Sequence, residues 1–243
     1  MVSWADIREL ALGVERLLLP GECMLCRATL AAREWDALAC SLCRARWRRL
    51  PAPFCARCGQ PGLPDLGCRF CADWTPALGR VRSAVWLDGN AREAVHHLKY
   101  GGWPGMARGL AESMRGLEPL EPGTVLVPIP LGRARLRSRG YNQAEVLAQS
   151  LASIGRLEVR TDLIGRARET RSQTALTPSA RAANVHAAFV AMGPVPDRLV
   201  LVDDVCTTGA TLLAAAEALA AAGATRVEAV TFARAPLPVP GSM

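Results

Sequence analysis

Cysteine pairs near the start of the chain carry the clearest chemistry in the sequence. Eight of the nine cysteines fall into four C-x-x-C pairs: Cys23/Cys26, Cys40/Cys43, Cys55/Cys58 and Cys68/Cys71. Each pair forms a tight knuckle that directs two thiolates toward one point, and two knuckles complete the tetrahedral sulfur site that zinc prefers. The pattern therefore predicts two zinc ions, each held by four cysteines.

The spacing of the pairs leaves the ligand assignment partly open. We expect neighbouring pairs to share an ion, which gives one site of Cys23, Cys26, Cys40 and Cys43 and a second of Cys55, Cys58, Cys68 and Cys71. A crossed arrangement, with the first pair joined to the third, fits the same spacing, and an iron–sulfur cluster is the main alternative to zinc. Because all eight thiolates would be ligands, no coordination position stays open and we expect a structural role. The segment has few long apolar runs, so metal binding would supply much of its folding free energy.

A second chemical motif lies near the end of the chain. Leu199–Val202 is a continuous apolar run, typical of a strand buried on both faces of a parallel sheet. Asp203 and Asp204 follow it, and an apolar helix pattern begins at Leu212. Between them lies a loop of small and hydroxylated residues: Val205, Cys206, Thr207, Thr208, Gly209, Ala210 and Thr211. Since ligands of open α/β sheets bind beyond the carboxyl ends of the strands, we expect a binding site here.

The composition of this loop indicates which ligand it would bind. A loop of small residues that enters a helix offers free N–H groups and the positive end of the helix dipole, which together favour a phosphate. Three threonine hydroxyls can add hydrogen bonds, and Gly209 permits a close backbone approach. Two carboxylates beside a phosphate suit ribose hydroxyls or a magnesium ion. The motif therefore predicts a ribose 5-phosphate site in which Asp203 and Asp204 bind the sugar hydroxyls or the metal ion, while Cys206 needs no role beyond packing.

Two arginine-rich stretches lie between these motifs. The first follows a strand expected at Val125–Pro130 and precedes a helix expected from Ala144 to Ser153, with Asn142 as a possible cap; it contains Arg133, Arg135, Arg137 and Arg139. The second runs from Arg166 to Gln173 and contains Arg168 and Arg171. Guanidinium groups bind diphosphate oxygens in pairs, and a mobile second stretch could close over a ligand. The alternative is that both stretches are ordinary solvated loops.

Further strands and helices complete the expected domain. We expect a strand at Val81–Leu87, a helix at Ala91–Lys99 and a last strand at Arg226–Phe232. Lys99, beside a Gly-Gly turn, could reach a phosphate. The neighbouring histidines, His96 and His97, lie on the helix surface or pack, since neither has a partner at metal-binding spacing.

The domain organisation follows from these assignments. We expect an amphipathic helix over residues 1–19, a zinc-ribbon domain over 20–76, an α/β domain over 80–236 and a flexible tail over 237–243. Acidic residues interrupt the first segment, which therefore does not look like a targeting sequence. The most apolar later segment is too short to cross a bilayer, so we expect no membrane insertion. We expect a cytoplasmic protein, where paired cysteines more often bind metal than form disulfides.

Basic residues in the zinc-ribbon segment indicate nucleic acid as a candidate partner. The chain carries a formal net charge of +7, and Arg44, Arg46, Arg48 and Arg49 surround Trp47. Basic residues interleaved with an aromatic ring can bind single-stranded DNA by charge and stacking. The alternative is a solvated basic face on which Trp47 anchors the ribbon.

The motifs as a set resemble known families. The acid pair and loop at 203–209 closely resemble the PRPP-binding signature of type I phosphoribosyltransferases, in which the acids hold the 2′- and 3′-hydroxyls and the loop holds the 5-phosphate. With the four cysteine pairs, Lys99-Tyr100, the block Arg139-Gly140-Tyr141-Asn142-Gln143 and the basic stretch 166–173, nearly the whole chain resembles the ComF family. That resemblance implies a type I phosphoribosyltransferase-like parallel sheet flanked by helices, preceded by a double zinc ribbon, and a link to DNA uptake by competent bacteria.

Two functions are compatible with this resemblance. The first is a phosphoribosyltransferase that uses PRPP with Mg²⁺ and acts on an unknown base or amine. The second is a non-catalytic module that binds single-stranded DNA or senses PRPP, with competence-machinery proteins as possible partners. A transferase needs a hood, meaning a wall that recognises the acceptor. The sequence between residues 79 and 243 does not identify one, so the zinc ribbon is a candidate.

Overall fold

The computed structural model describes residues 21–62, 67–167 and 188–236. The helix expected at 1–19, the tail expected at 237–243, and Arg168 and Arg171 lie outside these ranges. None of the helices within them is both long and apolar enough to cross a lipid bilayer.

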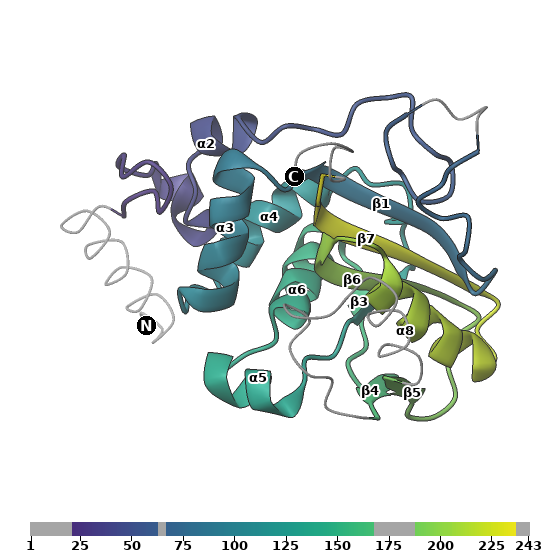
Figure 1. The fold of residues 1–243 in the computed structure, drawn as a ribbon. Coiled ribbons are helices and arrows are strands. Elements are labelled where there is room, and N and C mark those ends of the chain that lie inside the picture. The colour runs from purple at the N-terminus through teal and green to yellow at the C-terminus, as the bar shows by residue number, and fades with distance from the viewer. Residues whose placement is uncertain (1–20, 63–66, 168–187, 237–243) are drawn as a thin grey trace.

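A five-stranded parallel sheet forms the centre of the molecule (Figure 1). Every adjacent pair of strands is parallel, as the expected α/β fold requires. Both sheet faces are buried, because the strand residues alternate between two core clusters: Leu199 and Leu201 belong to one, and Val200 and Val202 to the other. In spatial order the strands are β1 (Leu78–Trp86), β7 (Arg226–Arg234), β6 (Arg198–Cys206), β2 (Val125–Pro128) and β3 (Glu158–Val159).

Helices cover the two faces of this sheet (Figure 1). One face packs against α3 (Gly89–Tyr100), α4 (Met106–Met114) and α6 (Gln143–Gly155), whose apolar side chains join the same core cluster. The other face packs against α8 (Ala210–Ala221) and the antiparallel pair β4 (Ile164–Arg166) and β5 (Phe189–Ala191). As expected, the Asn142 side chain caps α6, where it accepts a hydrogen bond of 3.1 Å from the Ala144 backbone N–H.

The first arginine-rich stretch is a helix rather than a loop. It forms α5 (Arg133–Arg139), in which no residue is buried. Arginine, alanine and leucine all have high helix propensity, which explains the helical conformation without any packing. The helix ends at Gly140, whose positive φ of 84° lets its N–H bond back to the Leu136 carbonyl.

The ribbon segment, residues 21–62 and 67–77, is docked onto the edge of the sheet at β1. It contains a short 3-10 helix, η1 (Ala32–Ala37), and α2 (Ser41–Ala45). Backbone N–H groups of Val81 and Trp86 in β1 donate to the Arg57 and Arg48 carbonyls, each at 2.8 Å. Strand β1 is therefore not left as an open edge, because the ribbon segment satisfies part of its backbone.

Trp47 fastens the ribbon segment to the core. Its side chain is only 4% exposed and meets the Phe232 ring edge-on, with the ring centroids 4.9 Å apart. The arginines around it also make intramolecular contacts: Arg44 pairs with Glu112, Arg48 pairs with Asp88, and Arg49 donates to the Ser113 carbonyl. Trp47 is therefore an anchor, as one of the two alternatives expected, and is not available to stack on a nucleotide base.

Replacing this anchor should lower stability. Trp47→Ala removes a buried ring between the ribbon segment and the sheet, so we expect it to reduce the free energy of unfolding by about 3–5 kcal/mol. Denaturant titration followed by circular dichroism measures the change. Arg46→Ala is the matched control because Arg46 lies next to Trp47 but is exposed. Equal stability of the two variants would contradict the anchoring role.

Candidate functional site

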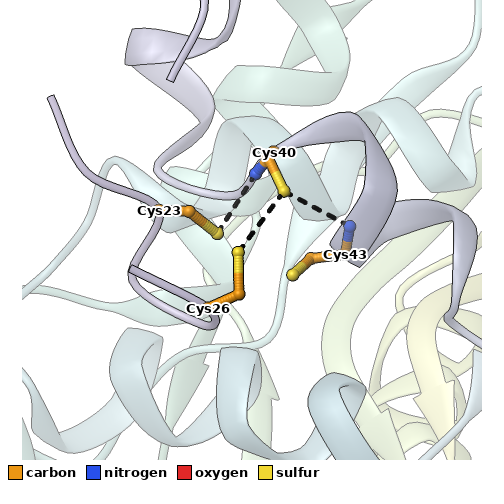
Figure 2. A group of neighbouring side chains, drawn as sticks. All are labelled: Cys23, Cys26, Cys40 and Cys43. Atoms are coloured by element: carbon orange, nitrogen blue, oxygen red, sulfur yellow. Dashed lines mark hydrogen bonds between the residues drawn. The ribbon is translucent and has the colours of Figure 1, made fainter. Parts of the chain in front are cut away.

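The eight paired cysteines form two compact groups, as expected. The four sulfur atoms of each group lie within 4.8 Å of one another, and Figure 2 shows those of the first group converging on one point. Within the groups, the Sγ–Sγ separations are 3.8 Å for Cys26–Cys40, 3.8 Å for Cys55–Cys71 and 3.5 Å for Cys58–Cys68. A tetrahedron with Zn–S bonds of about 2.3 Å has sulfur atoms roughly 3.8 Å apart. Neighbouring pairs therefore share a site, and the crossed arrangement is wrong.

The surroundings of the first group, Cys23, Cys26, Cys40 and Cys43, suit a cation. Burial opposes ionisation of Cys23, but backbone N–H groups outweigh it and lower its pKa to about 7. The Cys40 N–H, for example, donates to the Cys23 sulfur at 3.3 Å. Burial and the neighbouring sulfurs instead raise the pKa of Cys43. Four thiolates are thus compatible in this space only when a metal ion compensates their charge.

The acid pair, Asp203 and Asp204, lies at the carboxyl end of β6, where the sequence predicted it. Asp204 is 2% exposed, and its Oδ2 lies 2.6 Å from the Lys99 ammonium, which comes from the last turn of α3. Lys99 therefore reaches the site but contacts a carboxylate there. Its pKa is raised because the attraction of Asp204 outweighs the effect of burial.

The two carboxyl groups differ in how well their charge is compensated. Burial and then the adjacent charge of Asp204 raise the pKa of Asp203 well above its usual value, although Lys99 acts in the opposite direction. Each added hydrogen-bond donor or cation would stabilise the charged form of this carboxyl. The acid pair is therefore suited to a ligand that brings hydroxyl groups or a divalent cation.

The threonine loop, residues 205–211, connects the acid pair to the start of α8. Cys206 is buried in the core, whereas Thr207 and Thr208 are exposed. Gly209 has a φ of 78°, and a Cβ there would lie 2.3 Å from the Trp74 ring of the ribbon segment. Only glycine fits this position, so the ribbon segment supports the loop from behind. The first amides of α8 have no intrahelical partners, which makes this end suitable for an anion.

The acid pair and the threonine loop open into one cleft. Its volume is about 390 Å³, within the usual range for small-ligand sites. Strand β6 and the loop contribute Asp203, Asp204, Val205, Thr207 and Thr211. The facing wall comes from α3, whose cleft residues are Arg92, Val95, His96, Lys99 and Tyr100.

The arginines that reach the cleft differ from those expected. Arg135 and Arg166 line it, but Arg133, Arg137 and Arg139 of α5 do not. The Arg139 side chain instead bonds to the Gln143 side-chain oxygen. Successive residues of a helix point to different sides. Because the sequence did not predict a helix at 133–139, it could not indicate which arginine side chain would face the cleft. Arg166 donates to the Pro130 carbonyl at 2.9 Å and begins the second basic stretch, which was the available signal for it.

Comparison with known proteins agrees with both parts of the chain. Residues 136–237 match the phosphoribosyl transferase domain family, and residues 14–74 match the double zinc ribbon domain family. The DNA utilization protein YhgH of Salmonella typhi is 34% identical over 221 residues, which cover 87% of this chain and 96% of the relative. The Escherichia coli K12 protein of the same name is 31% identical over the same shares of the two chains.

A more distant relative spans nearly the whole chain. The competence protein ComFC of Bacillus subtilis is 26% identical over 257 residues, which cover 91% of this chain and 97% of the relative. The competence protein F of Haemophilus influenzae matches 45% of this chain at 35% identity. With its parallel sheet, its two cysteine groups and these relatives, the chain belongs to the ComF family of proteins that join a double zinc ribbon to a phosphoribosyl transferase domain.

Proposed function

We propose that the chain binds PRPP with Mg²⁺ and transfers its phosphoribosyl group to a nitrogen acceptor, in a pathway of DNA utilisation or uptake. The observation that carries this proposal is the acid pair at the mouth of the threonine loop, within one cleft of about 390 Å³. The names of the relatives, DNA utilization protein and competence protein, support the link to DNA.

The proposed roles follow from the charge and position of each group. Asp203 and Asp204 accept hydrogen bonds from the ribose hydroxyls, which relieves the poorly compensated charge of Asp203. Thr207, Thr211 and the first amides of α8 hold the 5-phosphate. Lys99 orients Asp204 through their 2.6 Å ion pair, so its proposed role is positioning rather than phosphate binding.

The transfer step depends mainly on charge stabilisation. The bond from ribose C1 to the diphosphate oxygen breaks, pyrophosphate leaves with the electron pair, and the acceptor nitrogen bonds to C1 through its lone pair. A proton carried by this nitrogen passes to the released pyrophosphate. Arg135 and Arg166 line the cleft and can bind the leaving pyrophosphate oxygens in pairs. The carboxylate oxygens of the acid pair are suitable Mg²⁺ ligands, and Mg²⁺ would supply further neutralisation of the diphosphate.

Asp204→Asn should weaken PRPP binding. The variant removes a charged acceptor from the ribose site and leaves Lys99 without its partner, so we expect the Kd for PRPP with Mg²⁺ to rise on the order of 10- to 100-fold. Isothermal calorimetry measures it, and thermal melting checks that the variant folds. Asp197→Asn is the matched control because Asp197 is an exposed residue just before β6, remote from its carboxyl end.

Two results would count against the proposal in different ways. If the wild type does not bind PRPP, the ligand assignment is wrong. If PRPP binds but no base or amine releases pyrophosphate, the protein is a PRPP-binding module and not a transferase.

Asp203→Asn should stabilise the ligand-free protein at pH 8. The raised pKa of Asp203 means that its ionisation costs folding free energy above that pKa, and the neutral amide removes this cost. The advantage of the variant should shrink as the pH falls toward about 4, the usual aspartate pKa, because the wild-type carboxyl then becomes neutral in both states. Denaturant titrations at several pH values measure the difference. A variant that is less stable than the wild type at pH 8 would contradict the conclusion that the raised pKa of Asp203 destabilises the folded protein.

The cysteine groups should bind two zinc ions per chain. We expect Cys26→Ser and Cys58→Ser each to remove about one equivalent, because each breaks a different four-sulfur site. Elemental analysis of the purified protein gives the stoichiometry. Cys206→Ala is the control and should retain both ions, since Cys206 is buried in the core and belongs to neither group. Purified wild type that carries iron and sulfide would exclude the zinc assignment.

A further inference from the structure

Helix α3 presents an aromatic surface to the cleft that sugar-phosphate binding does not use. His96 and Tyr100 are one helical turn apart, and both line the cleft. Their ring centroids are 5.2 Å apart and the ring planes are inclined by 47°, so the rings do not cover each other in parallel. The Tyr100 side chain remains 70% exposed.

A guanidinium group extends this surface. Arg139 of α5 lies over the Tyr100 ring, with Cζ 5.5 Å from the ring centroid, and its bond to Gln143 holds it there. Aromatic rings combined with guanidinium planes are the surfaces on which proteins stack nucleic-acid bases. His96 and Tyr100 together are called the α3 wall below, and Arg139 borders this wall from outside the cleft lining.

We propose that the α3 wall binds the acceptor of the transfer reaction, and that this acceptor is a planar heteroaromatic base. The inference rests on the proposed function, because it places the acceptor opposite the acid pair that would hold the ribose. It also assigns the hood, the wall that recognises the acceptor, to α3 and not to the zinc ribbon. The sequence alone had not identified a hood.

The charges around the cleft favour an uncharged ring over an alkylamine. The described cleft lining contains four cationic side chains, Arg92, Lys99, Arg135 and Arg166, against the two carboxylates of the acid pair. The acid pair is assigned to the ribose, so the described cleft lining leaves no carboxylate to pair with an ammonium group on the acceptor. Leu87 and Val95 lie beside the wall and offer apolar contact to a ring.

A base could reach this wall either as a free molecule or as part of a single strand. The fluorescent base 2-aminopurine distinguishes the two sources, because it can be supplied free or within a short single-stranded DNA, and its emission is quenched when it stacks. We expect the full-length wild type to quench at least one of these probes in a saturable titration. Quenching of the free base identifies a small acceptor, and quenching only within the strand identifies a base carried by DNA.

Variants of the wall separate stacking from other effects. Tyr100→Ala should raise the Kd for the quenched probe roughly 5- to 150-fold, which is the cost of losing one stacking partner. Tyr100→Phe keeps the ring and should bind like the wild type. His97→Ala is the matched control, because His97 is next to His96 but lies outside the cleft lining, near Glu93.

The outcomes for the wall and for PRPP are independent. PRPP calorimetry on Tyr100→Ala should give the wild-type Kd, since this residue is assigned to the acceptor and not to the sugar phosphate. Absence of quenching by the wild type, or equal quenching by Tyr100→Ala, would overturn the acceptor wall even if PRPP binds normally. A protein that quenches the probe through Tyr100 but does not bind PRPP would retain the wall as a base-binding site and lose the proposed transfer.

Discussion

Two adjacent carboxylates at the buried end of a strand impose the main constraint on this structure. Asp203 and Asp204 lie where β6 meets the cleft, and their mutual repulsion in a poorly solvated place must be compensated. One part of the compensation is internal, because Lys99 approaches Asp204 at 2.6 Å. The remainder is left for a ligand. A site that is electrostatically incomplete without hydroxyls or a cation gives up stability in exchange for binding, as functional sites often do.

The ribbon segment is part of the same arrangement because it supports the threonine loop from the side away from the cleft. Its Trp74 ring occupies the space that a side chain at position 209 would need. Arg57 donates hydrogen bonds to the Trp74, Thr75 and Leu78 carbonyls, which fixes the chain between the second cysteine group and β1. The cysteine sites thus order a segment that has little apolar sequence, and the ordered segment in turn holds the threonine loop.

Features that depend on local sequence were predictable, and features that depend on packing were not. The cysteine groups and the strand with its acid pair were predictable because short-range spacing determines them. Which arginines line the cleft was not predictable, since α5 is a helix and, of its four arginines, Arg135 lines the cleft. The burial of Trp47 depends on Phe232, which is far from it along the chain. The sequence therefore left open whether the Trp47 ring anchors the ribbon segment or stacks on DNA.

Helix α3 shows how one periodicity serves both the core and the cleft. Ala91, Ala94 and Leu98 are buried against the sheet side, whereas Arg92, His96 and Tyr100, each four residues apart, line the cleft. The Tyr141 hydroxyl, which donates to the Leu98 carbonyl at 2.5 Å, holds the last turn of this helix. That same turn carries both Lys99, which orients the acid pair, and Tyr100, which faces the cleft. The position of this turn therefore sets the distance between the acid pair and the α3 side of the cleft.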